Sequence, residues 1–202
     1  MITDESIKNQ TSEENESATY GLLLARATKT TRNKIKLKWK KVNGADGYLV
    51  YGNKCGKANK YKLIKSLSSN KTSYSQSKLK TGTYYKYMVV AYKLVDGKRV
   101  TIAVSKTIHA ATTGKSYCNV KSVKVNKSKV SIKKGKSFTI KASEVKSGKI
   151  LKKHRKICFE STNTSIATVN SKGKIVGKKK GVCYVYAYAQ SGVYRKIKVT
   201  VK

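Results

Sequence analysis

Strict alternation of apolar and polar residues over short runs is the feature that most constrains the fold of this chain. In residues 34–40 every second position is apolar, at Ile35, Leu37 and Trp39, and the other positions are lysines. Successive side chains of a β-strand point to opposite faces, so this period predicts a strand with one face in a core and its lysines in water. Three further runs alternate in the same way: 85–91, 100–104 and 197–201. No helical period of useful length accompanies them, which predicts an all-β chain.

Turn signals separate these runs at intervals of about ten residues, a spacing typical of β-sandwiches. The strongest lies in residues 95–98, because its Asp96-Gly97 pair accepts the positive φ angles of a two-residue type I′ hairpin turn. Residues 43–47 and 171–174 predict two more turns. The 202 residues suffice for two domains of about 100 residues each.

A small, polar segment at 110–116 lies between a run that would close one sandwich and a run, from Val123, that would open another. The first residues are polar and acidic and lack aromatic residues until Tyr20, which is typical of disorder. These features predict four parts: a disordered acidic leader at 1–19, a sandwich at 20–113, a linker at 114–116 and a sandwich at 117–202.

The charge balance is extreme, with 46 Lys and Arg residues against nine Asp and Glu and a net charge of +37. Five of the nine acids lie within residues 1–16, so residues 17–202 carry 45 cations against four acids. Such a body adheres to polyanions by charge alone, with strong salt dependence. The abundance of Lys, Asn, Tyr and Ile is typical of a low-GC genome, and this bias is an alternative source of part of the lysine excess.

Few residues are available for catalysis or for metal binding. Asp46 and Asp96 lie in predicted turns, where Asp serves backbone geometry. The two histidines, His109 and His154, have no nucleophile motif near them in sequence. Four dispersed acids do not supply the oxygen ligands that calcium needs. We therefore expect no enzymatic activity, no cofactor and no metal site.

The four cysteines form neither a CxxC motif nor a zinc-type cluster. Alternation places Cys183 inward and Cys158 outward, which argues against a disulfide between them.

No run approaches the roughly 20 apolar residues that a membrane span needs, and the N-terminus does not resemble a signal peptide. We expect an extracellular protein whose signal and anchor lie outside this chain.

The first predicted sandwich resembles a fibronectin type III domain. Trp39 stands in its second strand, and Leu79 is followed six residues later by Tyr85 and then by alternating core residues. The resemblance implies that the Tyr85 hydroxyl returns to the backbone near Leu79, as in a tyrosine corner. Thr81 stands where that family usually has proline.

The second predicted sandwich is similar to the second family of bacterial immunoglobulin-like domains. Four segments carry the resemblance: 134–140, 159–169, 173–177 and 180–185. The two resemblances together imply tandem immunoglobulin-like β-sandwiches. The second resemblance implies a role in a bacterial surface adhesin or as an accessory module of a secreted enzyme, where domains of that family occur.

Two charged or aromatic features are candidate surface contacts. Residues 146–156 hold six cations, apparently in a loop, and we expect four of them to contact an anionic wall polymer or acidic glycan: Lys152, Lys153, Arg155 and Lys156. A solvated loop is the alternative. Three tyrosines that alternate outward are expected to stack on sugar rings or donate hydroxyls to a partner: Tyr184, Tyr186 and Tyr188. Cross-strand packing that shields the sheet is the alternative.

A third candidate is an apolar patch expected on the outer face of the larger sheet of the first sandwich. Its members are Leu49, Tyr51, Met88, Val90 and Tyr92. Either the neighbouring module or an external protein is expected to contact it.

These observations predict a monomeric, non-catalytic adhesion and spacer module of a Gram-positive surface protein. Its expected partner is an anionic cell-wall polymer, a glycan or a surface protein, with neither membrane insertion nor specific nucleic-acid binding, because no nucleic-acid recognition motif is present. The alternative is an accessory segment that holds a larger secreted hydrolase near its substrate or the wall.

Overall fold

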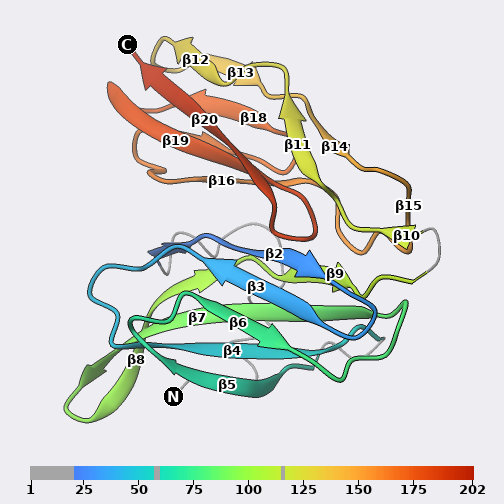
Figure 1. Cartoon of the computed structure of the whole chain (residues 1–202). Helices are drawn as coiled ribbons and strands as arrows, with labels where there is room; N and C mark the ends of the chain where they lie inside the picture. Colours follow the sequence, from blue (N-terminus) through green and yellow to red (C-terminus); the bar gives the residue numbers. More distant parts are fainter. Residues whose placement is uncertain (1–20, 57–59, 115–116) are drawn as a thin grey trace.

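The computed structural model describes residues 21–56, 60–114 and 117–202, and within them all regular elements are β-strands (Figure 1). The prediction of an all-β chain of tandem sandwiches is confirmed. The leader expected at 1–19 and linker residues 115–116 lie outside the described residues. None of the strand pairings found joins a strand of residues 21–111 to a strand of residues 117–201.

The first module contains nine strands arranged in two sheets. The larger sheet has the order β1-β8-β7-β4-β5, with β9 also paired to β7, and the smaller sheet has the order β2-β3-β6. The strands are β1 (Gly21–Leu23), β2 (Ala25–Thr30), β3 (Ile35–Trp39), β4 (Gly47–Lys54), β5 (Lys62–Ser68), β6 (Ser73–Gln76), β7 (Tyr84–Val95), β8 (Lys98–Ser105) and β9 (Ile108–Ala111).

The alternating run of β3 forms the core of this module as its period predicts. Ile35, Leu37 and Trp39 are buried between the two sheets with Tyr48 and Tyr87, and the lysines between them are exposed. Burial of side chains of this size contributes roughly 1.5–3 kcal/mol each and is the main source of stability.

The tyrosine corner is confirmed, because the Lys80 backbone N–H donates a hydrogen bond of 2.9 Å to the Tyr85 hydroxyl. The hairpin between β7 and β8 is also confirmed. Asp96 and Gly97 have φ angles of 50° and 71°, the positive values that a type I′ turn requires. This hairpin extends beyond the sandwich at the lower left of Figure 1.

The second module contains eleven strands and two principal sheets, with the orders β12-β20-β19-β16 and β13-β18-β17. Its strands are β10 (Tyr117–Cys118), β11 (Ser122–Val125), β12 (Lys129–Ile132), β13 (Ser137–Thr139), β14 (Ala142–Val145), β15 (Lys149–Ile150), β16 (Cys158–Ser161), β17 (Ala167–Val169), β18 (Lys174–Gly177), β19 (Gly181–Tyr188) and β20 (Tyr194–Val201). The turn expected at 171–174 joins β17 to β18 and has Gly173 at φ 78°.

The two faces of β19 differ as the alternation predicts. Cys183, Val185 and Ala187 lie in the core of the second module. Cys158, on the neighbouring strand β16, packs on the opposite face with the tyrosines of β19. No disulfide joins Cys158 to Cys183.

The Tyr85→Phe variant tests the tyrosine corner. Loss of the hydroxyl leaves the Lys80 N–H without this acceptor, so we expect the free energy of unfolding to fall by about 1 kcal/mol, the usual net value of one hydrogen bond. Denaturant unfolding of the full chain measures the change. An unchanged free energy would contradict a stabilising role for the corner.

Candidate functional site

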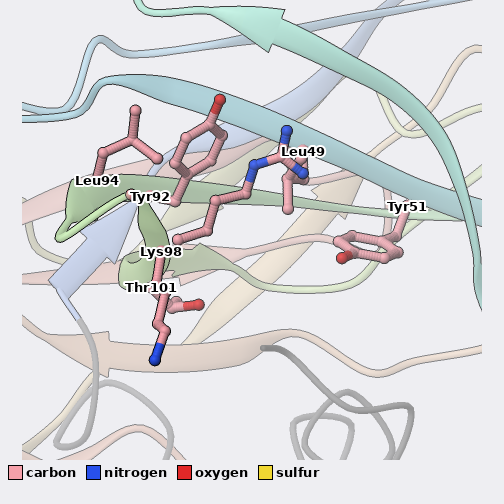
Figure 2. Close-up of a pocket in the computed structure, with 8 residues that line it drawn as sticks. Leu49, Tyr51, Tyr92, Leu94, Lys98 and Thr101 are labelled. Atoms are coloured by element: carbon pink, nitrogen blue, oxygen red, sulfur yellow. The ribbon is translucent and has the colours of Figure 1, made fainter.

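A pocket of about 590 Å³ lies on the outer face of the larger sheet of the first module, beside the β7–β8 hairpin (Figure 2). Its lining combines apolar, aromatic and cationic residues: Leu49, Tyr51, Tyr92, Leu94, Gly97, Lys98, Arg99 and Thr101. Volumes of this size are typical of ligand pockets. The lining found includes two cations and no carboxylate, which favours an anionic or neutral occupant.

The hairpin that forms one wall of the pocket is held by the turn before β4. An Asp46 carboxylate oxygen accepts a hydrogen bond of 2.7 Å from the Leu94 backbone N–H. The Arg99 guanidinium lies 5.0 Å from the centre of the Tyr92 ring. This cation–π contact joins two residues of the pocket lining. Leu94 itself is 49% exposed.

The apolar patch expected on this sheet lies around and beneath the pocket. Leu49, Tyr51 and Tyr92 line the pocket, whereas Met88 and Val90 are fully buried under them in a cluster of first-module residues. The prediction that the neighbouring module covers this patch is wrong, because the second module packs on other residues. The prediction of contact with an external partner stays a prediction.

The second module instead packs through its tyrosines on the residue that joins β1 to β2. Leu24 is buried against Tyr186 and Tyr188, which are 6% and 1% exposed. The three tyrosines of β19 do point away from the core of their own module. The expectation that they offer an open surface is nevertheless wrong for Tyr186 and Tyr188. Of the three, Tyr184 alone is half-buried, and the Lys196 ammonium nitrogen lies 3.6 Å from the centre of its ring.

A buried acid lies beside this tyrosine contact. The Tyr188 hydroxyl donates a 3.0 Å hydrogen bond to Glu160, and Lys106 of the first module lies 3.8 Å from the same carboxylate. Burial, then the negative charge of Glu160 and the hydrogen bond to it, raise the pKa of Tyr188 well above its ordinary value. Glu160 faces away from the core of its own module, into the contact between the modules.

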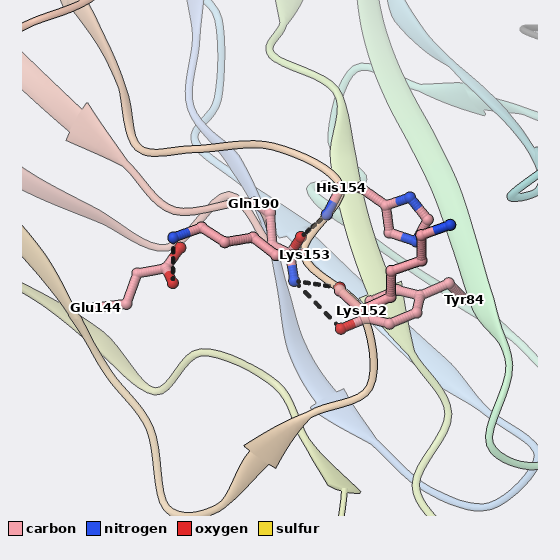
Figure 3. Close-up of polar contacts among 6 residues, drawn as sticks. All are labelled: Tyr84, Glu144, Lys152, Lys153, His154 and Gln190. Carbon is pink, nitrogen blue, oxygen red and sulfur yellow. Dashed lines mark hydrogen bonds and ion pairs between the residues drawn. The ribbon is translucent and has the colours of Figure 1, made fainter.

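Gln190 is the polar centre of the contact between the modules (Figure 3). Its side-chain amide donates to the Tyr84 hydroxyl at 3.2 Å and to the Lys152 carbonyl at 3.3 Å, and it accepts from the His154 N–H at 2.8 Å. Its backbone carbonyl accepts a 2.6 Å hydrogen bond from the His109 N–H. One buried residue thereby joins β7 and β9 of the first module to the second.

The basic loop is partly engaged in the structure. Lys153 forms an ion pair of 3.3 Å with Glu144, and the half-buried Arg155 donates to the Ala189 carbonyl at 3.0 Å. Lys152 and Lys156 have exposed side chains. The four cations therefore do not form one open patch, although contact of the loop with a polyanion stays a prediction.

Two ring contacts close the joint beside the basic loop. The His154 ring stacks on His109 with ring centres 5.1 Å apart and meets Tyr84 edge-on at 4.7 Å. Burial, then Arg155 and His154, then Lys86 lower the pKa of His109 to about 3. Sequence reasoning did not assign Gln190 or this histidine pair to a contact, because their partners lie 36 to 106 residues away along the chain.

Asn119 fastens the chain immediately after the linker. Its side-chain amide accepts from the Ala111 N–H at 2.9 Å, donates to the Ala111 carbonyl at 2.8 Å and donates to Thr30 at 3.2 Å.

The described residues contain no group of three or more His, Cys, Asp and Glu side chains suited to hold a metal ion. They also contain no helix with the length and apolar character needed to cross a membrane.

The Gly192→Ala variant tests the packing of the joint. Gly192 has a φ of 79°, and a Cβ atom there would collide with the Ala25 carbonyl oxygen of the first module. Gly135→Ala is the matched control, because its φ is 76° and nothing lies near the added methyl group. We expect both variants to lose about 1 kcal/mol through the left-handed backbone. Gly192→Ala should lose more and separate the modules, as measured by thermal unfolding and by distances between spin labels. Equal losses with unchanged distances would contradict the tight contact.

The depressed pKa of His109 predicts an acid-sensitive fold. Between the unfolded pKa near 6.5 and the folded value of about 3, the unfolded chain binds the extra proton, so stability falls as the pH falls. The slope contributed by this residue is at most about 1.4 kcal/mol per pH unit. Denaturant unfolding between pH 7 and pH 4 should show a shallower pH dependence for His109→Gln than for the wild type. Identical slopes would contradict the assignment.

In comparisons with known proteins, the second module matches a family model. Residues 119–201 match the family model described as Bacterial Ig-like domain (group 2). No curated protein matches the chain. A solved structure that it resembles is the fibronectin type-III domain of human fibronectin type III domain containing protein 3, with 18% identity over 46% of this chain and 86% of that chain and a TM-score of 0.38.

With a TM-score of 0.38 the similarity is weak, and the fold of the first module is defined by its own features. These are two facing sheets with the orders given above and a tyrosine corner. Residues 119–201 are therefore similar to bacterial Ig-like domains of group 2, and they follow a β-sandwich with a tyrosine corner.

Proposed function

We propose that this chain is a non-catalytic extracellular adhesion and spacer unit of a bacterial surface protein, and that it adheres to anionic polymers of the cell envelope. Modules of the two kinds found here are typical of surface or extracellular proteins and are generally non-catalytic. The polymer and the adhesive role are the proposed part.

The observation that carries this proposal is the distribution of carboxylates. The second module has two acids, Glu144 and Glu160, whose side chains are 8% and 5% exposed and are each paired with a lysine. Asp46 and Asp96, the two acids of the first module, lie in turns. Both modules therefore offer a polyanion many exposed lysines and few accessible carboxylates, so the attraction is not locally cancelled.

The contact between the modules supports the spacer part of the proposal. Buried tyrosines, the Gln190 hydrogen bonds and the Asn119 bonds fix one module on the other. Contacts of this density favour a defined angle over a flexible hinge. A fixed pair of basic modules presents its charges in a constant arrangement to an extended polymer.

Purified Gram-positive cell walls provide the test. We expect the full chain to sediment with walls at low salt and to be released steeply as salt rises, because screening removes the attraction between exposed charges. Walls stripped of their anionic polymers are the control and should retain little protein. Salt-insensitive binding, or no binding at low salt, would overturn the electrostatic mechanism.

A further inference from the structure

The outer face of the smaller sheet of the first module carries two cross-strand pairs of like charge. Arg26 on β2 lies directly opposite Lys38 on β3, and Lys29 lies directly opposite Lys36. All four side chains are exposed. Like charges at such positions destabilise a sheet, because their side chains are held roughly 5 Å apart. Neither of the two ion pairs found in the described part of the chain involves these residues.

A β-bulge produces the second of these pairs. Ala27 lies opposite Leu37, so a regular strand would place Thr28 opposite Lys36. The register shift between Ala27 and Lys29 places a lysine there instead, and the Thr28 hydroxyl donates to the Lys36 carbonyl at 3.3 Å. Bulges commonly re-aim a side chain at functional sites. Here the backbone irregularity adds a repulsive contact that an unbroken strand would avoid.

The third strand extends each pair with a hydroxyl group. Ser73 of β6 lies opposite Lys38, and Ser75 lies opposite Lys36, both exposed. Two parallel rows therefore cross the sheet: Arg26, Lys38 and Ser73, and Lys29, Lys36 and Ser75. Residues two apart on a strand are roughly 6.7 Å apart, which is the distance between the rows. We call this surface the cation face.

We propose that the cation face is the main docking surface for a linear polyanion, one whose phosphate or carboxylate groups repeat along its length. This inference rests on the proposed function and names the surface that performs it. Bound anions neutralise both like-charge pairs at once, so binding relieves the repulsion. Arg26 offers paired donors to one anionic group, and the serine hydroxyls donate to the edge of the chain.

Other basic surfaces of the molecule are less suited to this role. In the basic loop, Lys153 is paired with Glu144 and Arg155 is bonded to a backbone carbonyl. In the second module one pair of cations, Lys129 and Lys198, lies in register. The cation face combines two such pairs with no acid on the outward positions of its strands.

A charge-matched pair of variants tests the proposal in the full chain. The face variant carries Arg26→Gln, Lys29→Gln, Lys36→Gln and Lys38→Gln. The control carries Lys172→Gln, Lys174→Gln, Lys178→Gln and Lys179→Gln, four exposed residues of the second module. Both lose four charges. The probes are inorganic polyphosphate and poly-glutamate, which separate phosphate from carboxylate as the preferred group.

We expect the face variant to bind at least one of the two probes at least tenfold more weakly than the wild type at about 50 mM salt. A plot of the logarithm of its association constant against the logarithm of the salt concentration should be less steep, with a slope smaller in magnitude by about 3. The control should lose less than threefold. The midpoint of thermal unfolding of the face variant should equal or exceed that of the wild type, because repulsion is removed. Polyphosphate should raise the midpoint of the wild type more than that of the face variant.

Equal losses of binding in the two variants would overturn the inference, because binding would then follow net charge, and would leave the proposed function standing. A face variant that unfolds below the wild type would overturn the argument from repulsion. Failure of the wild type to bind either probe or purified walls would overturn the proposed function as well.

Discussion

Repulsion among cations is the constraint that shapes this molecule, since 45 of them share residues 17–202 with four acids. Burial of apolar faces between the sheets has to outweigh that repulsion. Each of these four acids has a structural role. Asp46 holds the β7–β8 hairpin and Asp96 forms its turn, while Glu144 and Glu160 pair with lysines.

The joint between the modules follows from the same constraint. Residues 20–113 carry 21 cations and two acids, and residues 114–202 carry 24 cations and two acids, so the two bodies repel each other. The contact accordingly depends on neutral groups: the tyrosines around Leu24, the Gln190 amide and a histidine that stays uncharged. Glu160 lies within this contact, between Lys106 and Tyr188.

The cation face shows where repulsion is left in place. The second module has one cation pair in register, Lys129 and Lys198, whereas β2 and β3 align two such pairs. A bulge brings Lys29 opposite Lys36 in one of them. Proteins commonly keep such locally unfavourable arrangements where binding relieves them. The pocket beside the hairpin is a second, chemically different surface, because its lining is mainly apolar and aromatic.

Sequence patterns were enough to predict the strands, their inward faces, the hairpin at Asp96-Gly97 and the tyrosine corner at Tyr85. These depend on a period of two and on local backbone geometry, which neighbouring residues specify. Tertiary structure alone decided which outward faces stay open. An outward tyrosine such as Tyr188 has the same local pattern whether water or another module covers it, and Lys29 faces Lys36 through a register shift that alternation does not encode. Burial between modules and pairing across a bulge depend on contacts between distant segments, so they emerge only when the sheets have packed.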